Sequence, residues 1–232
     1  MHPHRSTQKL VLRPATTADV DWGASAIFAS GPALFGYVFA SSPDDARTIF
    51  QKAFVYPGHA FSYEHTQVVE SDGQPAGLIL GYPGKVKRQA EEKMQPVMAR
   101  LLPLRKLPRI LVNLADLNRI KQDVFWYDYY ILSVGVLPEF RNQGIGTFLL
   151  TNAERQAKAA NCQAMCLDVT YANARARRLF ERNGYRVVCN KTSDRFHQMT
   201  RAGGLSRMMK PLFVPDQDEV ESILLAEDCR NL

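Results

Sequence analysis

Runs of apolar residues divide the chain into short segments, most of them bounded by glycine or proline. Residues 62–70 and 75–82 flank Ser71-Asp72-Gly73-Gln74, and Asp-Gly between two apolar runs predicts a β-hairpin. The longest run of aromatic and β-branched residues covers residues 125–136 and predicts a central strand. Shorter runs predict further strands at residues 10–13, 163–169, 185–188 and 206–212.

Helical patterns lie between these strands. A helix across the twenties would be capped by Thr17 or Asp19 and would meet a second short helix at Gly31-Pro32, because proline does not continue a helix. Residues 85–121 have helical character, with interruptions expected near Pro96, Pro103 and Pro108. The other expected helices cover residues 145–160 and 173–183, the second ending at Asn183-Gly184. This mixture of strands and helices predicts an α/β or α+β domain around one sheet.

The composition is typical of a globular protein, with 232 residues, 46% hydrophobic and 22% charged. It excludes a disordered chain, and the length fits one large domain. We expect that domain to cover residues 1–212, with residues 83–124 as a helical insertion and residues 213–232 as an acidic C-terminal tail.

The cysteines and the apolar stretches bear on the cellular setting. Four cysteines with no Cys-x-x-Cys pair and no neighbouring histidine cluster argue against a disulfide framework and a structural zinc site, so no metal is expected. The N-terminal residues lack the apolar run of a secretory signal, and Gly31-Pro32 would break a spanning helix within residues 22–43. We therefore expect a cytoplasmic protein that does not act at a membrane.

Charge is unevenly distributed around a net value of +6. Residues 83–124 carry ten Lys/Arg and four Asp/Glu, whereas residues 213–232 carry six acids and one base. A basic balance suggests an anionic partner, either a phosphorylated cofactor or nucleic acid. Nucleic acid is the less favoured partner, because aromatic residues do not alternate with the bases in 83–124.

The most informative stretch is a strand, a turn and the start of a helix between Ile131 and Leu150. A buried strand runs into Pro138, and a short loop with Arg141, Gly144 and Gly146 leads into an amphipathic helix. Glycines at a helix start let a ligand approach the free backbone amides, and the helix dipole attracts an anion. A diphosphate fits such a loop, although neither common nucleotide-binding fingerprint is present.

Two motifs in this chain resemble the GNAT superfamily of N-acetyltransferases. The first is Val136-x-Pro138-x-x-Arg141-x-x-Gly144-x-Gly146, which looks like the acyl-CoA pyrophosphate motif of that family. The second, Asn173 to Tyr185, is similar to the segment after the family's fifth strand. Leu12-Arg13-Pro14-Ala15 with Asp19 resembles the family's usual opening, and the 62–82 hairpin resembles its second and third strands.

The resemblance implies a GNAT-like mixed sheet of about seven strands, with helices on both faces and with parallel fourth and fifth strands that splay apart. Acetyl-CoA, as cosubstrate, would place its pantetheine arm between these strands, and Asn173 would contact it. Arg175, Arg177 and Arg178 are candidates for its 3′-phosphate. The residues expected to bind acetyl-CoA are Val134, Gly135, Val136, Arg141, Asn142, Gln143, Gly144, Ile145, Gly146, Thr147, Asn173 and Phe180.

The implied reaction is direct transfer of an acetyl group to a primary amine in a ternary complex. Asp128 is the first candidate for the general base, and Glu64 the second. The family usually has a tyrosine that acts as the general acid. The matching position in this chain is Phe180, which cannot donate a proton. Tyr130, Tyr171 and Tyr185 are alternative acids, and solvent could also protonate the CoA thiolate.

The acceptor and the assembly are left open. The acceptor would be a small-molecule amine or a protein amine. The basic 83–124 segment favours an acceptor that carries a carboxylate or phosphate. Phe180 also motivates a second hypothesis, a catalytically weak acyl-CoA-binding sensor or interaction module. A third is a nucleic-acid-binding protein. A homodimer is compatible with the sequence.

Overall fold

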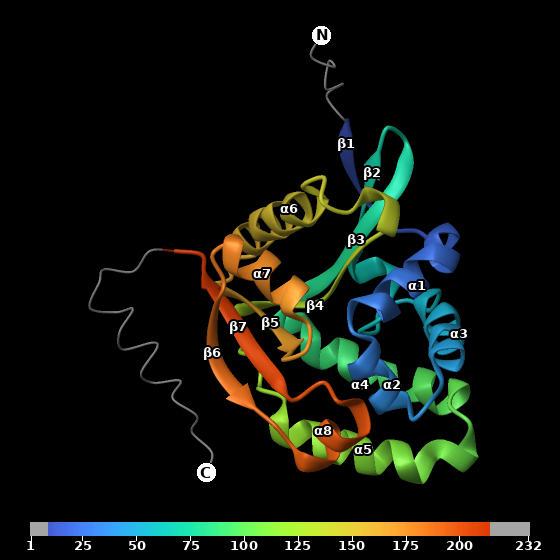
Figure 1. Ribbon diagram of the computed structural model, residues 1–232. Coiled ribbons are helices and arrows are strands. Elements are labelled where there is room, and N and C mark those ends of the chain that lie inside the picture. The colour runs from blue at the N-terminus through green and yellow to red at the C-terminus, as the bar shows by residue number, and fades with distance from the viewer. Residues whose placement is uncertain (1–8, 214–232) are drawn as a thin grey trace.

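The computed structural model describes residues 9–213, in which seven strands form one mixed sheet (Figure 1). The order across the sheet is β1-β2-β3-β4-β5-β7-β6, and every neighbouring pair is antiparallel except β4 and β5. The strands are β1 Leu10–Pro14, β2 Thr66–Ser71, β3 Gln74–Pro83, β4 Asp128–Val136, β5 Ala164–Thr170, β6 Arg186–Lys191 and β7 Leu205–Pro211. The predicted sheet of about seven strands with helices around it is confirmed.

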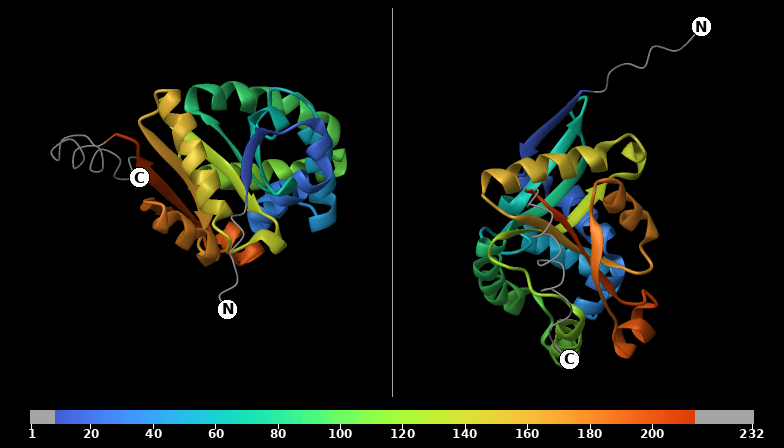
Figure 2. Two further views of the ribbon diagram at one scale, coloured as in Figure 1. Left: turned by 90° about the horizontal axis from the view of Figure 1, so that it is seen from above. Right: turned by 90° about the vertical axis from the view of Figure 1, so that its left-hand side faces the viewer.

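Helices cover both faces of this sheet (Figures 1 and 2). Helix α6 packs on one face with Ile79 and Ile131. The opposite face of β3, with Leu78 and Leu80, packs against a phenylalanine-rich cluster from α1, α2 and α3. The helices are α1 Val20–Ser30, α2 Pro32–Phe39, α3 Pro43–Phe54, α4 Gly84–Leu101, α5 Leu107–Ile120, α6 Ile145–Ala159, α7 Ala174–Arg182 and α8 Asp194–Thr200.

Strands β4 and β5 separate part of the way along their length. They pair from Asp128↔Ala164 to Ile131↔Leu167, and the ladder stops there although β4 continues to Val136 and β5 to Thr170. Unpaired strand edges offer N–H and C=O groups to a ligand. The splayed strands predicted from the resemblance are therefore present.

Two predicted turns have the expected geometry. The hairpin between β2 and β3 turns at Asp72 and Gly73, whose φ angles of 50° and 82° both lie in the left-handed region that a two-residue hairpin turn requires. The break at Gly31-Pro32 separates α1 from α2, with Pro32 in the first turn of α2. Short-range sequence signals were sufficient to predict both turns.

Several predicted boundaries are wrong. Residues 63–65 form a 3-10 helix instead of strand, and β4 begins at Asp128 because the Asp128 amide donates back to the Phe125 carbonyl in a turn. Pro96 lies inside a continuous α4, so only Pro103 interrupts the 84–120 region, and Pro108 lies in the first turn of α5. Of the two predicted caps, Thr17 belongs to a 3-10 helix, Thr17–Asp19, which Thr16 and Asp19 cap reciprocally, whereas Asp19 is the N-cap residue of α1. Helices α3 and α8 were not predicted.

Part of the predicted organisation lies outside the described residues. The acidic tail falls almost wholly in residues 214–232, so nothing is said of its structure. Within residues 9–213, no helix is long and apolar enough to cross a membrane. The same residues contain no group of three or more His, Cys, Asp or Glu side chains that could hold a metal ion.

Candidate active site

The gap between β4 and β5 opens into a narrow cleft. One wall is the strand pair itself, with residues 131–134 of β4 and 167–170 of β5. The opposite wall comes from the end of α1 and the start of α2, at Ser30, Gly31, Leu34 and Phe35. Asn173, Ala176 and Phe180 at α7 and Leu205 of β7 complete the lining. Residues from six elements, far apart in the sequence, therefore meet where the two strands separate.

Ser30 connects the two sides of this cleft. The Ser133 hydroxyl on β4 donates to the Ser30 hydroxyl over 2.7 Å, and the Asn173 side-chain amide lies 3.5 Å from the Ser30 carbonyl. The Asn173 carbonyl oxygen also accepts from the Ala176 amide, which caps α7. The structure thus places Asn173 at the cleft and fixes its side chain at the start of a helix.

The loop after β4 leads into the N-terminus of α6. Gly144 is the N-cap residue with φ of 82°, a conformation that favours glycine, and a side chain at this position would point into open space. A Cβ on Gly146 would lie 2.9 Å from Leu179 of α7, so glycine allows α6 and α7 to approach closely. The amides in the first turn of α6 have no partner within the helix and are available to an anion.

Side chains of the loop stabilise its shape. The Arg141 Nε donates to the Val136 carbonyl over 3.1 Å, and the Gln143 amide donates to the Glu139 carbonyl over 2.9 Å. Asn142, with φ of 64°, accepts from the Arg175 guanidinium over 3.3 Å. Arg141 and Gln143 therefore hold the loop by side-chain contacts, and a bound anion would mainly contact the backbone of Gly144–Thr147, which we call the candidate anion cradle.

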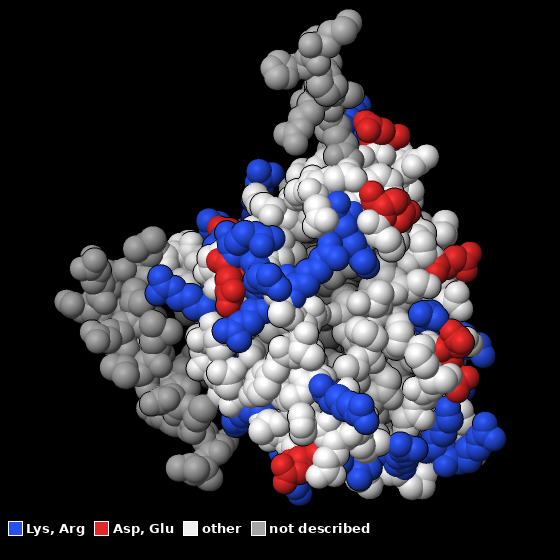
Figure 3. All heavy atoms as spheres, in the orientation of Figure 1, with Lys and Arg blue, Asp and Glu red and all other residues white. Residues whose placement is uncertain are grey.

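Lys and Arg side chains gather over α7 and the loop before α6 (Figure 3). Arg175 reaches the loop through Asn142, whereas Arg177 is paired with Glu181 over 2.8 Å one helical turn away. The Arg178 Nε donates to the Ala174 carbonyl of its own helix. Of the three arginines suggested for a phosphate, Arg175 is thus the one in contact with the loop before α6.

The inner end of the cleft contains a buried polar network that the sequence analysis missed. Asp168 of β5 accepts a hydrogen bond from the Tyr130 hydroxyl over 3.1 Å, and it forms an ion pair with Arg207 of β7 over 2.8 Å. The side chains of Asp168 and Arg207 are each 4% exposed. Asp168 also lines the cleft, so this network connects Tyr130 to the site. A charged residue inside the apolar run Ala-Met-Cys-Leu-Asp-Val-Thr was the available signal, because such a charge needs a specific partner.

The surroundings of Tyr130 keep its hydroxyl protonated. Burial and the neighbouring Asp168 carboxylate raise the pKa of Tyr130 well above its usual value, although Arg207 acts in the opposite direction. Lys87 and Lys121 lie 5.9 Å and 5.5 Å from the ring centre, and burial lowers the pKa of Lys121. Tyr130 therefore acts as a hydrogen-bond donor to a carboxylate at neutral pH.

The structure does not bring the other predicted catalytic residues to the cleft. Asp128 is buried at the paired end of β4, which is about 20 Å along the strand from Val134 at roughly 3.3 Å per residue. The ring of Tyr171 packs on Gly203 and Gly204 and does not line the cleft. Tyr185 is buried with its hydroxyl against the Met165 sulfur.

Glu64 and Phe180 have packing roles that their positions explain. The Glu64 carboxylate accepts from the Gly58 amide over 2.7 Å and stabilises a loop before β2. Phe180 is 7% exposed, lines the cleft and packs edge-to-face on Tyr185 at 5.8 Å between ring centres. At this point in the fold the chain offers an apolar surface instead of a proton donor.

These features fit an acyl-CoA cosubstrate. The splayed strands offer backbone groups to an amide-containing arm, and the start of α6 offers amides and a helix dipole to a diphosphate. The glycine at position 144 leaves the cradle open, because no heavy atom lies within 4 Å of a Cβ built there. Among the described residues, the fit rests on the backbone of β4 and α6, with Asn173 and Arg175 as polar side chains.

Comparison with known proteins agrees with this geometry. Residues 119–185 match the model of the acetyltransferase (GNAT) family. A 62-residue segment is 42% identical to an uncharacterised N-acetyltransferase of Methanocaldococcus jannaschii, and this match spans 26% of this chain and 40% of the relative's length.

Solved structures extend the likeness over most of the fold. An acetyltransferase crystal structure superposes with a TM-score of 0.61 at 23% identity and covers 88% of this chain and all of its own. An N-acetyltransferase from Staphylococcus aureus Mu50 gives 0.63 at 18% identity, over 86% of this chain and 99% of its own. Residues 119–185, which run from the end of α5 through β4, α6, β5 and α7, therefore match the acetyltransferase (GNAT) family, and the described residues have the fold of these two solved acetyltransferases.

Proposed function

We propose that this protein transfers an acetyl group from acetyl-CoA to a primary amine. The observation that carries the proposal is the separation of β4 and β5 after Ile131 and Leu167, directly beside the glycine-containing start of α6. The pantetheine arm would lie along Val134–Val136, and the diphosphate would lie on the amides of Gly144–Thr147. Asn173 and Arg175 would provide polar side chains to the same cosubstrate.

The chemistry would take place at the inner end of the cleft. The thioester supplies an activated acetyl group to the acceptor amine. A backbone N–H on the unpaired edge of β4 is suited to stabilise the negative charge that develops on the carbonyl oxygen. As the new C–N bond forms, the amine nitrogen must lose a proton, and as the C–S bond breaks, its electron pair leaves with the CoA thiolate, which would take a proton from solvent.

Asp168 and Tyr130 replace Asp128 as our candidates for handling that proton. Asp168 lines the cleft, and its contact with Arg207 compensates its negative charge without removing it from the site. The proton would pass from the amine to Asp168, directly or through one water. Tyr130 donates to the same carboxylate and would orient it.

The activity is tested with a panel of primary amines, by following the thiol released from acetyl-CoA. The panel includes small amines with and without a carboxylate or phosphate, and a peptide with a free N-terminus and a lysine. Thiol release that depends on one class of amine supports the proposal and identifies the acceptor class. Release of thiol at the same rate with every amine would indicate hydrolysis of acetyl-CoA and would contradict the proposed transfer.

The apolar Phe180 supports one alternative, an acyl-CoA binder with little catalytic activity. Phe180→Tyr restores a hydroxyl at the position where the family usually has one. If the wild-type protein is active and Phe180→Tyr changes its turnover by less than about threefold, the protein is an enzyme that needs no acid at position 180. A wild-type protein that binds acetyl-CoA but transfers nothing, with activity gained by Phe180→Tyr, favours the binding module.

A further inference from the structure

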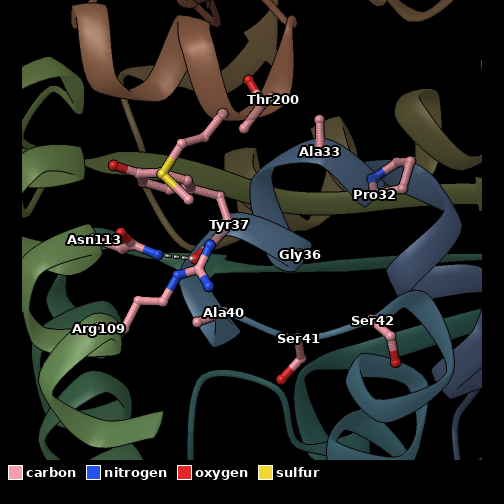
Figure 4. Close-up of a pocket in the computed structure, with 11 residues that line it drawn as sticks. Pro32, Ala33, Gly36, Tyr37, Ala40, Ser41, Ser42, Arg109, Asn113 and Thr200 are labelled. Carbon is pink, nitrogen blue, oxygen red and sulfur yellow. Dashed lines mark hydrogen bonds between the residues drawn. The ribbon is translucent and has the colours of Figure 1, made fainter.

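A second depression lies on the other side of α2 from the cleft. It is a groove of about 490 Å³ between α2, α5 and α8 (Figure 4). This volume is within the range of small-molecule sites. Its lining combines hydroxyl, amide and apolar groups with one cation: Pro32, Ala33, Gly36, Tyr37, Ala40, Ser41, Ser42, Arg109, Asn113, Met199 and Thr200.

The floor of the groove is held by buried hydrogen bonds. The Asn113 side-chain amide donates to the Tyr37 carbonyl over 2.7 Å, and the Tyr37 hydroxyl donates to Asp116 over 2.6 Å. Ser193, which caps α8, donates to the same carboxylate over 2.7 Å. Tyr37 and Asn113 are 3% and 0% exposed, so α2, α5 and α8 are joined by a fixed polar network beneath the groove.

The charges around the groove favour an anion. Arg109 extends from α5 across the groove toward Tyr37 and Ala40, and it forms no ion pair or hydrogen bond within residues 9–213 (Figure 4). Lys106 lies at the rim, 3.1 Å from the Ser41 hydroxyl. Two acids lie close by. Asp45 is paired with Lys106, and the buried Asp116 accepts from Tyr37 and Ser193.

We propose that this groove binds a small molecule with a carboxylate or phosphate group, and that Arg109 is the cation that holds this group. Arginine binds such groups through two parallel hydrogen bonds. The Ser42 hydroxyl accepts from the Asp45 amide and can donate its proton to another polar atom of the ligand, whereas the Ser41 and Thr200 hydroxyls already donate to the Phe39 and Phe196 carbonyls. Met199, Pro32 and Ala33 provide an apolar wall for its carbon skeleton.

The groove and the cleft share one helix. Pro32 and Ala33 line the groove, whereas the adjacent Gly31 and Leu34 line the cleft, so the two sites lie within about one helix diameter, roughly 10 Å. Two sources of ligand have the chemistry of the groove: the anionic end of the acceptor, and a separate regulatory molecule. The site itself does not depend on the proposed transferase activity.

The test uses O-phosphoethanolamine and inorganic phosphate as probes, with CoA present in excess so that the α6 cradle is blocked. Backbone amide NMR shifts of Gly36, Ala40 and Thr200 report binding in the groove. Arg109→Gln is the test variant. Arg119→Gln is the matched control, because Arg119 is an exposed arginine on the same helix that does not line the groove.

We expect saturable shifts in the groove, a loss of affinity of at least about tenfold in Arg109→Gln, and no comparable loss in Arg119→Gln. Arg109→Lys should bind with intermediate affinity. Equal affinity in the wild type and Arg109→Gln would overturn the proposal, and so would equal losses in both Gln variants, which indicate unspecific charge attraction.

Two additional measurements separate this proposal from the proposed function. N-acetylation of O-phosphoethanolamine in the presence of acetyl-CoA identifies the groove ligand as the acceptor, whereas groove shifts without acetylation identify a regulatory ligand. If CoA fails to bind but the groove shifts remain, the transferase proposal fails and the groove site stands. If CoA binds but the groove residues do not shift, the groove proposal alone is wrong.

Discussion

At the scale of single residues, the site is defined by groups whose roles depend on precise surroundings. Tyr130 was one of several tyrosines in the sequence, and only its contact with Asp168 distinguishes it from Tyr171 and Tyr185. Asp168 is held in place by Arg207 from β7, a residue 39 positions away. Contacts of this kind arise from strand pairing across the sheet, so no local motif could have identified them.

The first prediction concerns this network. Asp168→Asn removes the proposed base and should lower turnover by about 10²-fold or more, whereas Tyr130→Phe removes one hydrogen bond and should lower it by about tenfold. Steady-state kinetics measure both. Tyr171→Phe is the control, because its ring packs outside the cleft, and we expect it to leave turnover within about twofold of the wild type.

The result depends on the variants remaining folded. Asp168→Asn leaves Arg207 without its carboxylate, so circular dichroism and CoA affinity are measured alongside turnover. A fully folded Asp168→Asn variant with normal CoA affinity and normal turnover would exclude Asp168 as the base.

At the scale of elements, tight contacts join the segments that frame the cleft. Arg13 of β1 bonds both Asp19 before α1 and Glu70 of β2, which fixes the start of α1 on the sheet. On β4, a Cβ at Gly135 would lie 2.9 Å from the Ala26 carbonyl, so α1 packs directly on the strand next to the cleft. The position of Ser30 at the cleft follows from these two contacts.

The second prediction follows from Asp19. The Arg13 guanidinium lowers the pKa of Asp19 from 3.8 to about 2, against the effect of burial. Because the folded-state pKa is lower than the unfolded one, the stabilisation is fully present above about pH 4 and is lost as the pH falls toward 2. The shift corresponds to about 2 kcal/mol. Urea unfolding of wild type and Asp19→Asn should differ by this amount at pH 7 and converge near pH 2, and a constant difference would contradict the assignment.

The third prediction concerns Pro96, an exposed residue inside α4. Proline within a helix removes a backbone hydrogen bond and strains the preceding turn. Pro96→Ala should therefore raise the free energy of unfolding by about 1–3 kcal/mol and leave acetyl-CoA affinity unchanged. Denaturant titration measures the first quantity and calorimetry the second. A destabilised Pro96→Ala variant would show that the proline is required for packing of α4.

At the scale of the whole molecule, local signals predicted more of the fold than of the site. The hairpin at Asp72-Gly73, the break at Gly31-Pro32 and the strand–turn–helix at 131–150 all depend on short-range chemistry, and they were found. Helix α3 was not predicted, although Ala46, Ile49, Phe50 and Ala53 have helical spacing. The boundary of β4 was missed because the aromatic residues 125–127 form a turn.

Of the candidate site, the sequence predicts the parts that depend on local backbone geometry, whereas the parts that depend on tertiary contacts are seen only in the structure. The cradle at Gly144 and the cap at Asn173 follow from the chain's own turns. Asp128 was favoured because it begins a central strand, but which end of β4 opens into a cleft is decided by the pairing with β5. The groove at Arg109 lies between α2, α5 and α8, and no local sequence signal predicts that these helices are neighbours.

Binding of acetyl-CoA at the start of α6 is tested most directly by measuring its affinity by calorimetry for three proteins. These are the wild type, Gly144→Glu and the control Gly73→Glu. Gly144 and Gly73 have the same φ of 82° and open space around a built Cβ, but Gly73 lies in the β2–β3 turn. Both variants place a side chain at the same left-handed φ and add the same charge, so Gly73→Glu is a matched control for position.

We expect wild type and Gly73→Glu to bind acetyl-CoA equally, and Gly144→Glu to lose at least about 100-fold in affinity because a carboxylate would occupy the anion cradle. No binding by the wild type, or equal binding by all three proteins, would rule out acetyl-CoA binding at the start of α6.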